Sequence, residues 1–187
     1  MTINPLNRRN LLGVFAATSV AAAPVMANAF GFLRGAGDMR RIKMYSGRTG
    51  ESVDVVYWVD GKYIREALNE INIFMRDWRT GQAIGIDPRT IDIASASARL
   101  MQTNEPYMML SGYRSPQTNN MLRRTMGGGV ARNSLHLVGK AADMRLKSRS
   151  VNQMYQAAVA CRAGGVGKYS RSNFVHMDCG QVRQWGS

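Results

Sequence analysis

Two histidines and one aspartate have the residue types and the spacing of a metal site. His136 and Asp143 are seven positions apart, and a single helix would separate them by about 10 Å, too far to share one ion. A turn at Gly139 followed by a strand would let His136 fold back towards Asp143. His176, on a second strand, would complete a set of two imidazoles and one carboxylate, which is common for catalytic zinc.

Two other interpretations of these residues stay open at the level of sequence. Each histidine could be a satisfied structural residue, and for the trio as a whole the two interpretations are about equal. Cys179 could also bind a metal, but residues three apart on a strand point to opposite faces, so it would not join His176. A structural metal site normally has four protein ligands, and only three good candidates are present here.

Asp178 follows His176 by two residues, so on a strand the two side chains would share a face. The carboxylate could then act as a general base, taking a proton from a metal-bound water and later giving it to the leaving amine. It could equally hydrogen-bond the ligand histidine from behind. The residues alone leave both roles open.

The segment Ser111-Gly112-Tyr113-Arg114-Ser115-Pro116 lies where a strand should end and a helix should begin. Arg114 could bind a peptide carboxylate with two hydrogen bonds or stabilise a tetrahedral oxyanion. The alternative, which this segment alone favours, is a capping turn with an arginine that faces solvent. The glycines at 127–129 predict a loop, but no Lys-Ser/Thr pair follows them, which disfavours a phosphate-binding loop.

The elements around these residues predict an α+β fold. Helices are expected early and strands late, which disfavours a wound parallel sheet. The residues from 30 to 50 indicate an irregular lead-in, and Asp60-Gly61 indicates a tight hairpin turn between 53–59 and 62–63. Further strands are expected at 107–113, 140–147, 166–169 and 174–179, and helices at 64–78, 88–102, 116–124 and 151–162.

The first 29 residues have the layout of an export signal. Arg8 and Arg9 precede an alanine-rich apolar stretch, and Ala27-Asn28-Ala29 supplies the small residues that a signal peptidase reads. The arginine pair favours the twin-arginine route to the periplasm. A membrane anchor is the alternative, but the stretch is short and contains Pro24, so we expect cleavage and no stable membrane insertion afterwards. Residues 30–187 would form a single domain.

The net charge and the cysteine content of the sequence limit the kinds of partner and the disulfides that we expect. The formal net charge is +13, and loss of Arg8 and Arg9 with a leader that contains no acid leaves +11. Outside the cytoplasm such a protein has few nucleic acids to meet, so we expect no nucleic-acid partner; it meets anionic lipids and the carboxylates of the cell wall. Cys161 and Cys179 could form a disulfide in an oxidising compartment, and we expect this pairing.

Three motifs in order, S-G-Y-R-S-P-Q-T-N, S-L-H-L-V-G-K-A-A-D and F-V-H-M-D, resemble the exported murein endopeptidase K family, the YcbK-like proteins. That family belongs to the zinc D-Ala-D-Ala-carboxypeptidase-like group, which is related in fold to VanX and to the hedgehog signalling domain. The resemblance covers about residues 40–187. It implies a small antiparallel sheet flanked by helices, and one zinc ion held by His136, Asp143 and His176.

The resemblance also implies a function, namely hydrolysis of peptide cross-links between the stem peptides of peptidoglycan. It assigns substrate binding to Arg114, and we expect Tyr113 and Ser134 to help orient the peptide. Relatives in the wider group carry a base at positions that Asn173 and Phe174 occupy here, so we assign the base to Asp178.

Two rival functions remain beside this assignment. One is a non-catalytic peptidoglycan-binding module that retains the fold, which the loss of the usual base positions favours. The other is an exported basic protein whose structural metal site serves binding to a protein partner.

Overall fold

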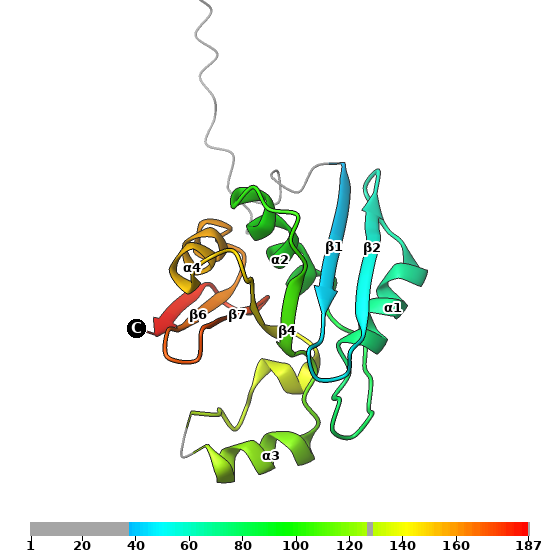
Figure 1. Cartoon of the computed structure of the whole chain (residues 1–187). Coiled ribbons are helices and arrows are strands. Elements are labelled where there is room, and N and C mark those ends of the chain that lie inside the picture. The colour runs from blue at the N-terminus through cyan, green and yellow to red at the C-terminus, as the bar shows by residue number, and fades with distance from the viewer. Residues whose placement is uncertain (1–37, 127–128, 187) are drawn as a thin grey trace, which may run out of the picture.

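Eight strands of the described chain form one sheet, in the order β3-β2-β1-β4-β5-β7-β6-β8 (Figure 1). The computed structural model describes residues 38–126 and 129–186; the expected leader and residues 127 and 128 of the glycine loop lie outside them. The strands are β1 (Met39–Tyr45), β2 (Ser52–Val59), β3 (Lys62–Tyr63), β4 (Tyr107–Ser111), β5 (Ala141–Arg145), β6 (Gly165–Tyr169), β7 (Phe174–Asp178) and β8 (Arg183–Gly186). The helices are α1 (Arg65–Phe74), α2 (Pro88–Leu100), α3 (Pro116–Thr125) and α4 (Val151–Ala160), with a short 3-10 helix, η3 (Leu135–Val138).

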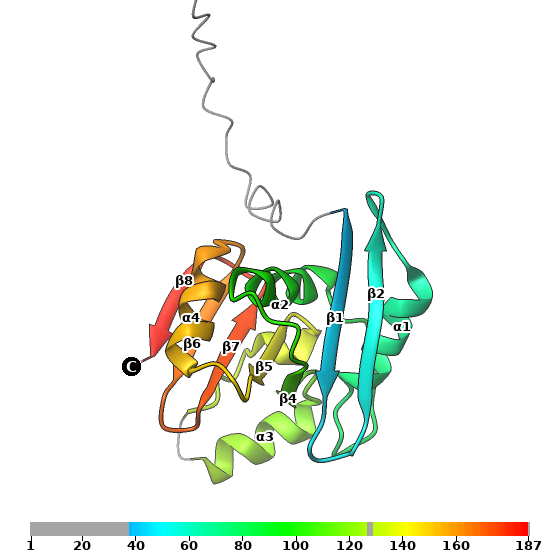
Figure 2. The ribbon, with the colours of Figure 1, turned by 45° about the horizontal axis from the view of Figure 1, so that its top comes forward.

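The sheet is mostly antiparallel, and only the pairs β1–β4 and β6–β8 are parallel. Figure 2 shows this order from β8 at one side to β2 at the other. The α+β class is therefore confirmed, with a larger sheet than the small one expected. No helix of the described residues is long and apolar enough to cross a membrane.

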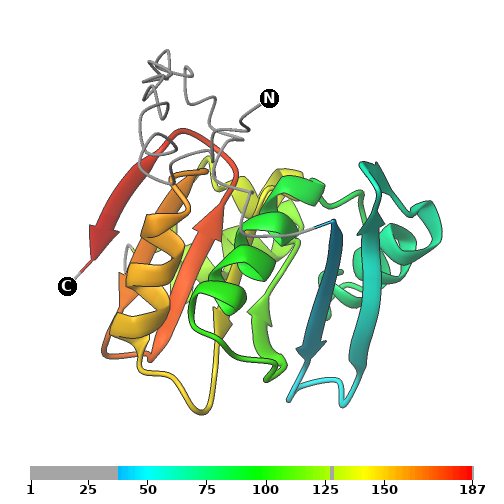
Figure 3. The same cartoon turned by 90° about the horizontal axis from the view of Figure 1, so that it is seen from above.

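Helices α2 and α4 cover one face of the sheet (Figure 3). Side chains along a strand point to opposite faces of the sheet in turn, so β5 can bury one set in the core and present the other set at the opposite face. Ala142 and Met144 are fully buried in the core, and Asp143 points the other way. The same holds for β7, where Val175 and Met177 are in the core and His176 lies between them.

The helix starts agree well with the sequence because their caps are local. Asp87 accepts from the backbone N–H of Arg89, and Ser150 forms a capping box with Gln153. Ser115 caps α3 in the same way, by accepting from the N–H of Thr118. The first helix was expected to reach Trp78 but ends at Phe74, because the following residues form a turn around the buried carboxylate of Asp77.

Two strands contradict the sequence-based expectation. The irregular lead-in expected over 30–50 contains β1, whose Ile42 and Met44 are buried while the residues between and beside them are polar. Strand β1 pairs with β2, and Arg41 and Asp54 form an exposed ion pair across the two strands. The terminal strand β8 was not expected; it pairs in parallel with β6.

The expected disulfide is also wrong, because Cys161 and Cys179 are both free and buried. The Cys161 thiol lies at the end of α4, 3.6 Å from the Oγ of Ser97 in α2. Burial raises the pKa of both thiols. Cys179 instead lies near the start of α2, where Thr90 and Asp87 are its neighbours. The two cysteines thus contact opposite ends of the same helix.

Candidate metal centre

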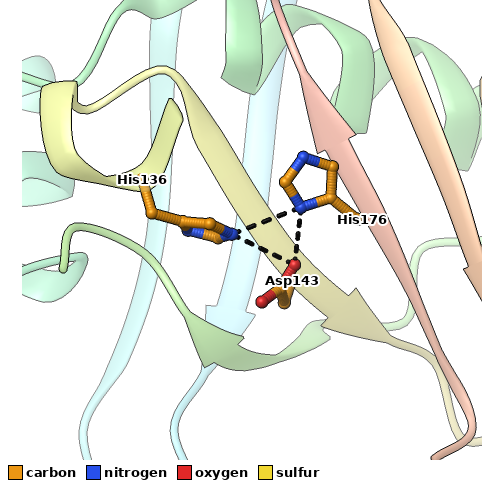
Figure 4. A group of neighbouring side chains, drawn as sticks. All are labelled: His136, Asp143 and His176. Carbon is orange, nitrogen blue, oxygen red and sulfur yellow. Dashed lines mark hydrogen bonds and ion pairs between the residues drawn. The ribbon is translucent and has the colours of Figure 1, made fainter. Parts of the chain in front are cut away.

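Three side chains predicted to bind metal converge on one point above the sheet (Figure 4). The Nε2 atom of His136 lies 3.2 Å from the Nδ1 atom of His176 and 3.2 Å from Oδ1 of Asp143. His176 Nδ1 and Asp143 Oδ1 are 2.8 Å apart. All three residues are at least nine-tenths buried. Ligand atoms of a tetrahedral ion with bonds of about 2.0–2.2 Å lie about 3.3–3.6 Å apart, so this spacing suits such an ion.

The outer nitrogen of each histidine has a fixed hydrogen-bond acceptor. His136 Nδ1 donates to the carbonyl oxygen of Gly112 at 2.7 Å, and His176 Nε2 donates to Oδ2 of Asp178 at 3.0 Å. In the neutral rings the two inner nitrogens are then lone-pair acceptors, and they face a carboxylate oxygen. Three acceptors repel one another unless a cation or a proton lies between them, so the donor set fits a bound metal ion.

Strand register and two turns bring these residues together. Asp143 of β5 lies directly opposite His176 of β7 in the antiparallel pair. His136 lies in η3, which Ser134 caps by accepting from the N–H of His136. Gly139 ends η3 at a φ of 67°, so the expected turn is present. A side chain there would also meet the carbonyl oxygen of Gly85 at 2.5 Å, which adds a second reason for glycine.

The segment 111–114 supports two of these three side chains. Besides the Gly112 carbonyl bond to His136, the N–H of Arg114 donates to the His136 carbonyl oxygen. The Arg114 guanidinium donates from Nη2 to Oδ2 of Asp143 at 2.8 Å and from Nε to Ser111 Oγ. Arg114 is 9% exposed. The capping turn is present at Ser115, but Arg114 does not face solvent and lies against the carboxylate of a candidate ligand.

The other two residues predicted to contact substrate differ in their position. Ser134 lines the cavity above the centre, and its predicted contact with a peptide stays a prediction. Tyr113 lies in the core with 8% exposure, is absent from the described lining of that cavity, and donates its backbone N–H to Met75. The described lining of the cavity thus gives its ring no place there, and the predicted substrate contact stays a prediction.

Asp178 lies behind His176 and has no free oxygen. Its Oδ2 accepts from His176 and from Arg183, and its Oδ1 accepts from the backbone N–H groups of Gly165 and Gly180 and from Arg183. The residue is fully buried. It shares a strand face with His176, as expected, but it contacts the nitrogen that points away from the metal centre. Of its two proposed roles, this geometry favours support of the ligand histidine.

The electrostatics of the centre follow from these contacts. Burial raises the pKa of Asp143, but the charges and hydrogen bonds of the two histidines outweigh it and hold the pKa well below its usual range. Burial lowers the pKa of His136. For His176 burial acts in the same direction, but hydrogen bonds to Asp143 and Asp178 raise its pKa to about 9. Burial also raises the pKa of Asp178, and its partners reduce it to about 2.

An open cavity of about 980 Å³ lies over the metal centre. Asp143 supplies the only carboxylate among the described residues that line it. Its walls carry five arginines and three aromatic residues: Arg48, Arg79, Arg114, Arg145, Arg183, Tyr169, Phe174 and Trp185. Sequence reasoning identified only Arg114 among these arginines, because the others come from separate turns and strands and share no local pattern.

The aromatic wall forms where β8 meets the β6–β7 hairpin. Tyr169 and Phe174 are stacked with ring centres 4.5 Å apart, and Trp185 donates its Nε1–H to the hydroxyl of Tyr169. Trp185 also packs over Gly167, where a side chain would meet the indole ring at 2.4 Å, and its ring centre lies 5.2 Å from that of His176. The unexpected strand β8 therefore contributes directly to the wall of the cavity.

Comparison with known proteins shows which family the chain belongs to. A family model described as Peptidoglycan L,D-endopeptidase MepK matches residues 34–185. The chain belongs to this family. Peptidoglycan L,D-endopeptidase MepK of Escherichia coli strain K12 is 38% identical over 179 residues, covering 96% of this chain and 97% of the relative. The Shigella flexneri protein of the same name matches equally well. The probable peptidoglycan L,D-endopeptidase MepK of Haemophilus influenzae is 36% identical over 138 residues, 73% of this chain and 74% of the relative.

Proposed function

We propose that this chain is an exported, zinc-dependent endopeptidase that hydrolyses peptide cross-links between peptidoglycan stem peptides. The observation that carries this proposal is the convergence of His136, Asp143 and His176 at the floor of an open cavity. Family membership supports the substrate class, and the description of the family narrows the bond to one between an L and a D centre. Residues 30–187 form the zinc peptidase domain in this proposal.

Each residue of the centre has a defined part in the proposed reaction. A zinc ion held there supplies Lewis acidity for the scissile carbonyl and lowers the pKa of a bound water to about 7. His136, Asp143 and His176 hold that ion. Arg114 fixes the Asp143 carboxylate through a charge-assisted hydrogen bond, and Ser134 lies where it can orient the peptide. Asp178 fixes the ring of His176, so its role here is support rather than proton transfer.

A second candidate is the non-catalytic peptidoglycan-binding module. It is favoured by the absence of a free carboxylate in the described cavity wall, since Asp143 is engaged in the metal centre and Asp178 is buried behind it. Such a module would keep the cavity and its arginines but would release no peptide from the wall.

Digestion of purified sacculi separates the two candidates. Zinc-loaded protein should release muropeptides that chromatography resolves, and a chelator should stop their release. His136→Ala should lose both metal and activity while keeping its circular dichroism spectrum, because the side chain is a ligand rather than part of the core. Asp54→Asn, a change in an exposed ion pair on β2, serves as the control and should keep both. Wall binding without any release would establish the non-catalytic module.

A further inference from the structure

Two exposed arginines lie at one end of the cavity, stacked against the same indole ring. The guanidinium carbon of Arg79 is 4.2 Å from the ring centre of Trp78, and that of Arg48 is 5.1 Å from it. Trp78 is itself 41% exposed. Stacking on an aromatic face restrains a guanidinium while it leaves the in-plane N–H donors available to a ligand.

Within residues 38–126 and 129–186 neither Arg48 nor Arg79 forms an ion pair with a carboxylate. The guanidinium of Arg48 donates one hydrogen bond, to the carbonyl oxygen of Leu110. Burial lowers the pKa of Arg79, and the nearby charges of Arg48 and Arg114 lower it further, against an opposing effect of Asp77. Like charges held this close are unfavourable without an anion between them.

The turn that carries Trp78 and Arg79 is fixed to the metal centre. The buried carboxylate of Asp77 accepts from the backbone N–H of Arg79 and from that of Ser115, one residue beyond Arg114. The N–H of Asp77 donates to the carbonyl oxygen of Gln82, which closes the turn. Arg79 is therefore held in a set position relative to Arg114 and Asp143, and Arg48 is tied to the end of β4 by its hydrogen bond to the carbonyl oxygen of Leu110, as a subsite for a rigid peptide requires.

We propose that Arg48 and Arg79, stacked on Trp78, form a subsite that binds a free carboxylate of the substrate peptide beside the scissile bond. The inference rests on the proposed function, which supplies the peptide, and deepens it by naming a determinant of specificity. A guanidinium fork matches a planar carboxylate with two parallel hydrogen bonds. The subsite would select cross-links in which that carboxylate is free over those in which it is amidated.

Binding of short peptides to the zinc-loaded protein tests this proposal without depending on turnover. The probes are the stem peptide without its cross-link, in free-acid form, and the same peptide with each carboxylate in turn converted to a carboxamide. Calorimetry should show that one of these amides binds about 10-fold to 100-fold more weakly than the acid. Arg79→Gln should bind acid and amide almost equally, and Arg48→Gln should reduce the preference in the same direction.

Matched variants separate recognition from folding. Both arginines are exposed, so their replacement should leave the melting temperature unchanged. Arg79→Lys keeps the charge without the fork and should retain only part of the preference. Arg99→Gln, an exposed arginine at the end of α2 on the covered face of the sheet, should keep the full preference.

The outcomes are distinct for the subsite and for the reaction. Equal binding of the acid and every amide by the wild type would overturn the subsite, and so would full preference in both glutamine variants. Hydrolysis of cross-linked versions of the same peptides reports on the proposed function separately. If the wild type cleaves neither version, the reaction is wrong while the binding data still decide the subsite. If it cleaves both, the glutamine variants should raise KM for the free acid and leave kcat nearly unchanged.

Discussion

At the scale of single residues, the centre depends on which nitrogen of each histidine is free. The Gly112 carbonyl selects Nε2 of His136 as the inner atom, and Asp178 selects Nδ1 of His176. The two rings thus present different nitrogens to the same point. A carbonyl oxygen is neutral and a carboxylate is charged. The two histidines should therefore differ in pKa and in how strongly metal binding depends on their acceptor.

Asp178→Asn tests whether that carboxylate supports a ligand or moves a proton. Loss of the negative charge behind His176 should weaken zinc binding by about 10–100-fold, and excess zinc should restore activity. Zinc affinity measured against a competing chelator, together with turnover at increasing zinc, checks this. Asp54→Asn should change neither. Activity that stays about 10²–10⁴-fold low in zinc-saturated Asp178→Asn would instead identify a general base.

Proton release on zinc binding provides a second test at this scale. With a pKa raised to about 9, His176 is protonated at pH 7.5 in the metal-free protein and must lose its proton to bind zinc. The pKa of His136 is lowered and that of Asp143 is well below its usual value, so neither should contribute. Calorimetry in buffers of different ionisation enthalpy should show nearly two protons released per zinc at pH 7.5, one from His176 and most of one from a zinc-bound water whose pKa is about 7. The His176 proton should be lost from the count as pH rises past 9, and release of one or fewer at pH 7.5, or of three, would contradict these assignments.

Residue types and spacing singled out the three candidate ligands but left a structural role equally open, and the family resemblance decided for a metal. The sequence could not decide the role of Asp178, since both roles require the same strand face. That decision came from Arg183 of β8, the N–H of Gly165 in β6 and the N–H of Gly180 in the turn after β7, which all reach Asp178. Arg48 and Arg79 escaped notice for a similar reason, because only the folded turns bring them to Trp78.

At the scale of elements, the end of β4 couples the core to the metal centre. Gly112 has no room for a side chain: a Cβ atom there would meet the carbonyl oxygen of Met75 at 2.4 Å and its Cβ at 2.8 Å. Its own carbonyl oxygen is the one that orients His136. Even a methyl side chain at position 112 would therefore be expected to change both the stability of the fold and its metal binding.

Gly112→Ala should lower the free energy of unfolding by about 1–3 kcal/mol, since the turn must move away from Met75. The same movement should weaken zinc binding, because the acceptor for His136 moves with it. Gly47→Ala is the control, with its nearest neighbour at an ordinary contact distance of 3.6 Å. Urea unfolding of the metal-free proteins and zinc titration of the folded ones measure the two effects. Unchanged stability with unchanged zinc affinity would show that the turn does not restrain His136.

Elements with local signals were predicted well. Asp60-Gly61 forms the expected hairpin turn with both residues at positive φ, and the caps Asp87, Ser115 and Ser150 start their helices. Strand β1 was missed because only Ile42 and Met44 mark its buried face between arginines and a lysine. Strand β8 has no alternating apolar pattern and is defined by its pairing with β6, which is a tertiary effect.

At the scale of the whole molecule, the proposed function requires the chain to reach the cell wall. Its basic charge suits an anionic polymer, and such attraction raises encounter rates without specifying the bond that is cut. Specificity then depends on the cavity, whose described walls carry five arginines and three aromatic residues beside the metal centre. The same chain must also leave the cytoplasm, and the proposed leader in the first 29 residues would direct that step.

Replacement of Arg8 and Arg9 by lysine tests the twin-arginine route while it conserves charge. Export by that route requires the arginine pair itself, so the double variant should accumulate as uncleaved precursor in the cytoplasm. Cell fractionation and mass spectrometry of the N-terminus, expected near Phe30 after cleavage, measure the outcome. Arg123→Lys with Arg124→Lys, an exposed adjacent pair on α3, is the matched control and should be exported normally. Normal periplasmic accumulation of the Arg8 and Arg9 variant would exclude the twin-arginine route, and a leader of this layout would then direct export through the general secretory route.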